Sequence, residues 1–179
     1  MCFKDFGMRP VIHLLSYFAT KRNQPITLLV STTGDTGPAA VHTVHEVANP
    51  LLTILVHYPH GQISDFQRRQ LTTLQSKYVK VVAFEGGGDD MDKPIKDTLL
   101  LSNSSNKSDL GRKQQHNGAD DGGDKGNPVK EEGEKERIFC GINSYNIGRP
   151  LMQMIHFLWI YLRMAEELGL QLGDAESPI

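Results

Sequence analysis

The sequence predicts an α/β fold in which helices flank a mainly parallel sheet. Four short runs are rich in Val, Ile and Leu without polar alternation, and helix-like stretches lie between them. Such runs are typical of strands that are covered on both faces, as in parallel sheets. Because strands and helices alternate along the chain, each strand can lie beside another with a helix crossing over between them. The expected strands are residues 26–31, 51–58, 79–84 and 137–140.

The expected helices occupy the segments around these strands. They are residues 6–21, 36–47, 64–77, a stretch from Asp90 or Asp92 to about Leu101, and a last helix from Pro150. Proline suits the first residue of a helix, where its missing N–H is not needed. Apolar residues then recur at helical spacing as far as Gly169, a natural stop. This apolar stripe is expected to face the core, and its members are Leu151, Met154, Ile155, Leu158, Trp159 and Leu162.

Residues 102–136 differ in composition from the rest of the chain. They include almost no apolar residue and are dense in Gly, Asn, Asp and Lys. Such a run cannot bury enough apolar surface to offset its chain entropy, so a disordered loop is predicted there. The loop would interrupt one domain without ending it. Residues 1–101 would form an α/β ligand-binding region, and residues 137–179 would continue it into an amphipathic helix and a tail.

Composition and charge exclude several classes of function. A chain of 179 residues with 39% apolar residues is long enough for one domain with a real core. The net charge of −2 gives no electrostatic case for binding a nucleic acid or an anionic membrane. The most apolar stretch, residues 151–164, contains His156 and Arg163 and is too short to span a bilayer. With no recognisable targeting segment, we expect a cytoplasmic protein, and secretion stays open as the alternative.

The sequence does not predict a metal site. Cys2 and Cys140 lie far apart, without the spacing of zinc ligands or of a disulfide framework. His42 and His45 lie three residues apart on an expected helix, but a metal would need a third ligand and groups that orient the ligands. A reduced intracellular compartment is therefore the default.

Residues 31–40, STTGDTGPAA, connect an expected strand directly to an expected helix. Gly34 and Gly37 permit a tight turn, and hydroxyl and carboxylate side chains surround it. Free N–H groups at a helix start bind anions, and ligands of open α/β sheets usually bind at the carboxyl end of a strand. The alternative is a structural turn in which Asp35 or Thr36 caps the next helix. Both interpretations stay open from these residues alone.

Lys4 is a second candidate functional residue. It lies between Phe3 and the pair Asp5-Phe6. A lysine beside aromatic residues can be a desolvated amine, as a Schiff-base lysine requires. The alternative is an exposed lysine near a frayed chain end.

Taken together and in order, the motifs resemble those of the threonine synthase family. F-K-D-F, a helix, a strand and then S-T-T-G-D-T-G-P-A-A follow the order and approximate spacing in threonine synthases and threonine synthase-like proteins. Residues 58–73 are similar to the family's P-x-G-x-x-S-x-x-Q-x-x-Q-M-T-T stretch. Residues 84–90, and 142–146 with Arg149, continue the resemblance. It covers nearly the whole chain except the loop and the tail, and several motifs in one order are more specific than any one alone.

The resemblance implies a partial fold-type II architecture, as in the β subunit of tryptophan synthase, and pyridoxal 5'-phosphate as the cofactor. Lys4 would bond to the cofactor and later move protons, and Asp35 would lie beside the cofactor ring. The cofactor would supply the sink for carbanion electrons. The substrate side would be lined by Ser31, Thr32, Thr33, Gly34, Thr36, Gly37, Asn143, Ser144, Asn146 and Arg149.

The chain is more similar to the threonine synthase-like branch than to plant or bacterial threonine synthases. That branch implies elimination of phosphate from small phosphorylated amino acids such as O-phosphothreonine and O-phosphohomoserine. The expected products are 2-oxobutyrate, ammonia and phosphate. Threonine synthesis proper stays open as an alternative reaction. A flavodoxin-like protein that binds a nucleotide or phosphate also stays open, although only the α/β order and the glycine turn support it.

The start and the end of the chain motivate a further hypothesis. The chain begins at the lysine motif and ends before the family's glycine-rich loop for the cofactor phosphate, so a form truncated at both ends is expected. Such a form could act without catalysis, by binding proteins or by association with a full-length relative. Pro10 also lies where relatives continue a helix, and a proline there could kink it.

Overall fold

The computed structural model describes residues 2–87, 90–113 and 135–170, without the side chains of 103–113. A four-stranded sheet lies at the centre, and all its strand pairs are parallel. Its order is β3-β2-β1-β4. The predicted α/β class is confirmed, and each strand agrees with its expected range to within one residue. The strands are β1 (Ile26–Ser31), β2 (Leu52–Pro59), β3 (Val79–Phe84) and β4 (Ile138–Gly141).

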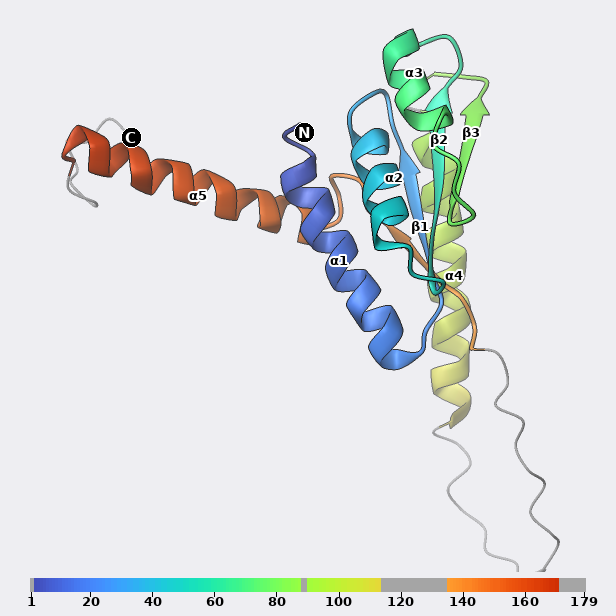
Figure 1. Ribbon diagram of the computed structural model, residues 1–179. Helices are drawn as coiled ribbons and strands as arrows, with labels where there is room; N and C mark the ends of the chain where they lie inside the picture. Colours follow the sequence, from blue (N-terminus) through green and yellow to red (C-terminus); the bar gives the residue numbers. More distant parts are fainter. Residues whose placement is uncertain (1, 88–89, 114–134, 171–179) are drawn as a thin grey trace, which may run out of the picture.

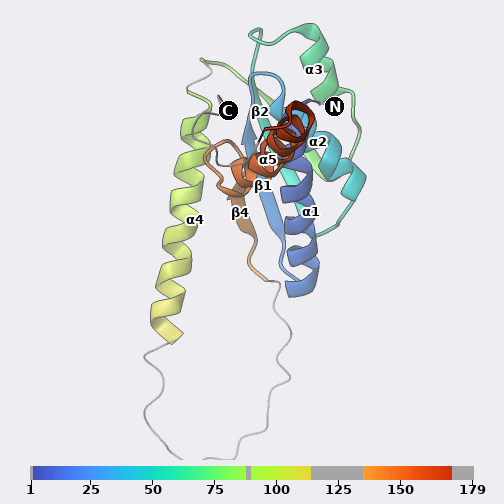
Figure 2. The same ribbon diagram turned by 90° about the vertical axis from the view of Figure 1, so that its left-hand side faces the viewer.

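Helices cover both faces of the sheet, as Figures 1 and 2 show from two sides. α1 and α2 lie on one face and α4 lies on the other. The chain moves outward from β1 to β2 and β3, and then returns to place β4 on the opposite side of β1. Because parallel crossovers are right-handed, this reversal sends the later helix to the other face. The helices are α1 (Asp5–Arg22), α2 (Thr36–Val47), α3 (Asp65–Thr72), α4 (Asp92–Lys113) and α5 (Gly148–Leu168).

The core lies mainly between the sheet and the pair α1 and α2. β1 is central, and five of its six residues are buried. β3 is an edge strand and corrects the expectation that every strand is covered on both faces, because Val82 is 38% exposed. Apolar runs therefore identified the strands without revealing which of them lies at the edge. The largest fully buried side chains include Met8, Ile12, Leu28, Leu52, Ile54 and Leu71.

Helix ends follow local hydrogen bonding more closely than apolar spacing. α3 ends at Thr72, short of the predicted residue 77, and Ser64 lies outside it as its N-cap. The Gln67 N–H donates to Ser64 Oγ at 3.2 Å, and the Ser64 N–H donates to Gln67 Oε1 at 3.1 Å, which forms a capping box. α1 runs from Asp5 to Arg22 as one helix with Pro10 inside it. α5 begins two residues before Pro150 and ends at Leu168, and the Gly169 that follows has a φ of 65°.

α4 is longer than predicted. It continues to Lys113, whereas the expected end was near Leu101 and a loop was expected from residue 102. The prediction used the loss of apolar residues as a stop signal, but residues 102–110 contain no Gly or Pro, so nothing in the sequence breaks the helix there. Residues 114–134 of the predicted loop lie outside the described residues.

The apolar stripe of α5 is exposed, which corrects the expectation that it faces the core. Leu158 is 58% exposed and Trp159 is 60% exposed. α5 extends away from the sheet, and its beginning lies near α1 (Figure 1). Helical spacing shows which residues share a face, but it does not show what covers that face. None of the helices among the described residues combines the length and apolar character needed to cross a bilayer.

Candidate functional site

The candidate site lies where the strand order of the sheet reverses. β1 ends at Ser31 and β4 ends at Gly141, and the two strands are parallel neighbours. β2 and β3 lie on one side of β1, and β4 lies on the other. Open α/β sheets bind ligands at such a reversal, outside the carboxyl ends of the strands. The two predicted segments that follow these strands, residues 31–37 and 142–149, are therefore brought together.

Asn143 joins the two segments. Its Nδ2 group donates to the Ser31 carbonyl at 2.7 Å and to Ser31 Oγ at 3.2 Å. Its Oδ1 accepts the Ser31 N–H at 3.1 Å. Asn146 acts within its own turn, because its Nδ2 donates to the Gly141 carbonyl at 2.7 Å and its Oδ1 accepts the Gly148 N–H at 3.0 Å. Both amides thus position the backbone of the site.

Thr32 organises the glycine turn. Its side chain is buried, and its Oγ1 accepts the Gly34 N–H at 3.2 Å and the Gly37 N–H at 2.9 Å. These two N–H groups are therefore already bonded, whereas those of Asp35 and Thr36 have no acceptor among the described residues. Asp35 takes the N-cap position of α2 without a capping hydrogen bond from its side chain. Its exposed carboxylate is thus not used to cap the helix.

Lys4 and the glycine turn line one cavity of about 170 Å³. Lys4 is half-buried at the start of α1, and its Nζ lies 5.3 Å from the centre of the Phe3 ring. No carboxylate among the described residues forms an ion pair with it. Gln67 also lines this cavity, and a side chain at Gly34 would clash with it. The predicted lysine and the predicted turn are therefore neighbours in space, together with Thr32, Thr33, Gly34, Asp35 and Thr36.

Arg149 lines a second cavity of about 300 Å³ on the same turn. Its side chain is 6% exposed, and its Nε–H has no partner among the described residues. Burial lowers the pKa of Arg149, partly offset by the nearby Cys2 thiol. A buried cation without a partner is costly, so the position suits an anionic ligand. The other lining residues are Ser31, Thr32, Thr33, Thr36, Met91, Asp92, Asn143 and Ser144.

Asp92 is a site residue that the sequence reasoning missed. It is the first residue of α4, and its Oδ1 accepts a hydrogen bond from Ser31 Oγ. The pKa of Tyr145 is raised by burial and further by the charge of Asp92. An acid at the start of a helix is common as a cap, and the sequence marked Asp90 or Asp92 only as the start of a helix. Its proximity to Ser31 depends on the sheet order, which no sequence motif specifies.

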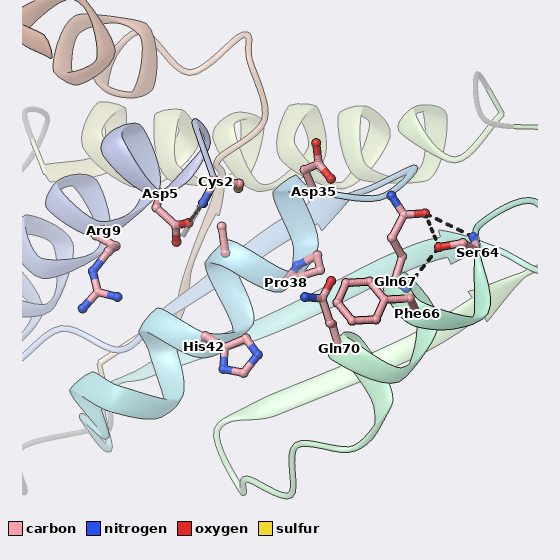
Figure 3. A pocket seen from close by; sticks show the side chains of 11 residues that line it. Cys2, Asp5, Arg9, Asp35, Pro38, His42, Ser64, Phe66, Gln67 and Gln70 are labelled. Carbon is pink, nitrogen blue, oxygen red and sulfur yellow. Dashed lines mark hydrogen bonds between the residues drawn. The ribbon is translucent and has the colours of Figure 1, made fainter.

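A third and larger cavity, of about 600 Å³, adjoins the Lys4 cavity. Figure 3 shows side chains that line it from the starts of α1 and α2 and from α3. Asp35 and Gln67 line both cavities. Arg9 lies at its edge and is paired with Glu46 at 2.8 Å. Within the described parts of the chain, no three His, Cys, Asp or Glu side chains lie close enough together to bind a metal ion.

Known proteins similar in sequence cover nearly the whole chain. Threonine synthase-like 2 of Xenopus laevis is 32% identical over 163 residues, which cover 91% of this chain and 28% of that protein. The human protein of that name is 30% identical over 166 residues, which cover 93% of this chain and 28% of that protein. No family model matches the chain.

Solved structures with the same fold agree with the sequence comparison. Threonine synthase from Escherichia coli aligns with a TM-score of 0.61 and 26% identity over 89% of this chain. Pyridoxal-phosphate-bound threonine synthase from Brucella melitensis aligns with a TM-score of 0.60 over 97% of this chain, and its 20% identity supports the fold alone. The chain spans 29% of each of these structures. It is therefore homologous to one segment of the threonine synthases and threonine synthase-like proteins, over somewhat more than a quarter of their length.

Proposed function

We propose that the chain forms the reactive-lysine and substrate side of a cytoplasmic pyridoxal-phosphate-dependent lyase that acts on phosphorylated amino acids. One observation supports this more than any other. The turn of residues 31–37 lines the Lys4 cavity and also the Arg149 cavity. An amine and a buried guanidinium thus border the same short turn. The homology to threonine synthase-like proteins supports the reaction class.

The residues of these cavities fit pyridoxal phosphate in two respects. Lys4 presents a half-buried amine that no described carboxylate neutralises, and such an amine can bond to an aldehyde carbon. The unpartnered Nε–H of Arg149 fits an anionic group of the substrate or cofactor. Asp35, exposed beside Lys4, would lie next to the ring. When bound, the cofactor supplies an electron sink that stabilises negative charge at the substrate α-carbon.

The chain's own residues would bind and orient the substrate and move its proton. Lys4 would take the proton from the α-carbon, because its amine borders the turn on which the substrate lies. Arg149 and the Ser144 hydroxyl would bind the phosphate group that leaves. Breaking the α-carbon–hydrogen bond and the carbon–oxygen bond to phosphate, with one water consumed, converts O-phosphothreonine to 2-oxobutyrate, ammonia and phosphate. Threonine synthesis proper would use the same lysine and anion site, so the products distinguish the two reactions.

Covalent labelling of Lys4 tests the proposal. The purified chain is incubated with pyridoxal phosphate, reduced with borohydride and mapped by mass spectrometry. We expect Lys4 to be the main labelled lysine, because its amine lies in a cavity beside anion-binding groups. The label should be lost in Lys4→Ala and kept in Lys21→Ala, a lysine of the same helix that also lies over an aromatic ring, at 5.6 Å from that of Tyr17.

Two outcomes of this experiment bear directly on the assignment. Selective labelling would justify an assay of phosphate release from O-phosphothreonine with the same variants. Labelling spread evenly over the lysines, unchanged in Lys4→Ala, would exclude Lys4 as the reactive amine of this chain.

A second candidate function is association with a full-length threonine synthase-like protein. The exposed apolar face of α5 favours it. Nine large apolar side chains on this helix are at least 41% exposed, and together they offer on the order of 800 Å² per partner, which is the size of a stable interface. The chain matches 28% of that relative, and the proposed contact would lie on the remainder of such a protein.

Sedimentation velocity of the chain mixed with purified threonine synthase-like 2 tests this association. We expect a complex at micromolar concentrations, and Leu158→Lys should weaken it because it places a charge in the apolar interface. Glu167→Lys, an exposed polar position on the same helix, should leave it unchanged. Independent sedimentation of the two proteins at all concentrations would rule the association out.

A further inference from the structure

We infer that Gln67 is a specificity-determining residue of the Lys4 cavity, and that its side-chain amide donates a hydrogen bond to the α-carboxylate of the substrate. Gln67 lies on α3, and its side chain lines this cavity together with Lys4 and the glycine turn. The inference rests on the proposed function, because it assigns a further residue to the same reaction. It goes beyond the capping of α3, which is the role that the hydrogen bonds of Gln67 already show.

The capping box fixes the orientation of the Gln67 amide. Gln67 Oε1 accepts the Ser64 N–H at 3.1 Å and the Ser64 hydroxyl at 3.0 Å. If the oxygen and the nitrogen of the amide were exchanged, two donors would face each other at the Ser64 N–H. The amide nitrogen therefore lies on the side of the group away from Ser64, as Figure 3 shows.

This nitrogen lies against the glycine turn. An added Cβ at Gly34 would clash with Gln67 Nε2, so the amide fits here because residue 34 has no side chain. Nε2 donates to no acceptor within the described parts of the chain. The N–H groups of Asp35 and Thr36, on the same turn, also have no acceptor there. The cavity thus offers several hydrogen-bond donors beside the amine of Lys4.

A carboxylate is the substrate group that suits these donors. It has two oxygens that only accept hydrogen bonds, and each can accept more than one. In an α-amino acid the carboxylate and the amine share the α-carbon. Because the proposed reaction bonds the substrate amine to the cofactor beside Lys4, the carboxylate falls in the Lys4 cavity, whereas the phosphate is assigned to Arg149. Asp35 is exposed, and its charge opposes that of Lys4, so the neutral donors would favour the carboxylate.

Gln67→Glu separates carboxylate binding from capping. Glutamate forms the same capping box with Ser64, but a negatively charged oxygen takes the place of the amide nitrogen. O-Phosphoserine and O-phosphoethanolamine, which lacks only the carboxylate, are titrated into the purified chain by calorimetry. We expect the affinity for O-phosphoserine to fall about 10- to 100-fold, because a hydrogen bond to a charged group is lost. The affinity for O-phosphoethanolamine and the free energy of unfolding in urea should change little.

Two further variants complete the experiment. Gln70→Glu places the same charge on α3, but Gln70 lines the larger cavity and not the Lys4 cavity, so both affinities should be retained. Gln67→Met removes the amide nitrogen without adding a charge. It should weaken O-phosphoserine selectively, but less than Gln67→Glu does.

The outcomes distinguish this inference from the proposed function. A loss confined to O-phosphoserine in both Gln67 variants would establish that Gln67 binds the carboxylate. Equal losses for the two probes, or no loss for either, would mean that Gln67 only caps α3, and the inference would be wrong while the proposed function stands. No binding of either probe to the unaltered chain would overturn the anion site of the proposed function, and this inference with it.

Discussion

Arg149→Met is expected to remove anion binding without a loss of stability. Hydrogen bonds to a charged group contribute roughly 1.5–3 kcal/mol, so affinity for inorganic phosphate should fall about 10- to 100-fold. Methionine keeps the aliphatic stem that packs on Gly7. It also removes a buried charge that has no partner among the described residues, and replacing such a charge by an apolar group is neutral or stabilising.

Calorimetric titration with phosphate and urea unfolding measure the two effects separately. Arg163→Met is the matched control, because Arg163 lies on the same helix, is 54% exposed and is paired with Glu166 at 2.7 Å. It should change neither quantity appreciably. A marked drop in the free energy of unfolding of Arg149→Met, with phosphate affinity unchanged, would show that Arg149 is a structural residue.

Gly37→Val should destabilise the fold by about 3 kcal/mol, the upper end of the range for overpacked cores. A Cβ at this position would meet Thr32 Cγ2 at 2.5 Å and Leu71 Cδ2 at 2.8 Å. Both of those side chains are buried, so neither can move into solvent. Thr32 also accepts two hydrogen bonds of the turn, and displacing it would break them. Valine gains little in return from helix propensity, because it is β-branched.

Urea unfolding followed by circular dichroism checks this prediction. Gly87→Val is the control, because the nearest atom to its added Cβ is a flexible carboxylate oxygen of Asp90 at 3.3 Å. That variant should lose less than about 1 kcal/mol. Equal stabilities of the two variants would mean that the turn has room which the described packing does not show.

Strands could be predicted from the sequence because their signal is local. Residues 26–31 form a short run rich in Ile, Leu and Val that follows a proline, and β1 has the same bounds. The environment of a helix face is not local. Leu158 and Trp159 have the spacing of core residues, yet they are exposed because no described element lies over them. The continuation of α4 beyond Leu101 was not predicted, because the prediction required apolar residues and the formation of a helix does not.

In the candidate site, too, some residues could be predicted from local sequence motifs and others could not. Lys4 and the glycine turn each carried a recognisable motif, and the structure places them on one cavity. The proximity of Asp92 to Ser31 had no such motif, because it arises from the position of α4 on the opposite face of the sheet from α2. Asn143 was expected as a ligand-side residue, and it lines the cavity while its hydrogen bonds to Ser31 also brace the turn. The motifs identified which segments belong to the site, and the order of the strands in the sheet shows how those segments are placed beside one another.

The sheet order also has a consequence for how the molecule assembles. β1, β2 and β3 pair with their neighbours along the chain, whereas Asn143 reaches Ser31 across 112 residues. A contact between residues far apart in the sequence requires closing a long loop, which costs more chain entropy than a local contact. We therefore expect β4 to join the sheet last. A chain that had formed only the first three strands would already contain much of its regular structure but neither the Asn143 brace nor the Arg149 cavity. The proposed anion site would therefore be complete only after β4 has joined the sheet.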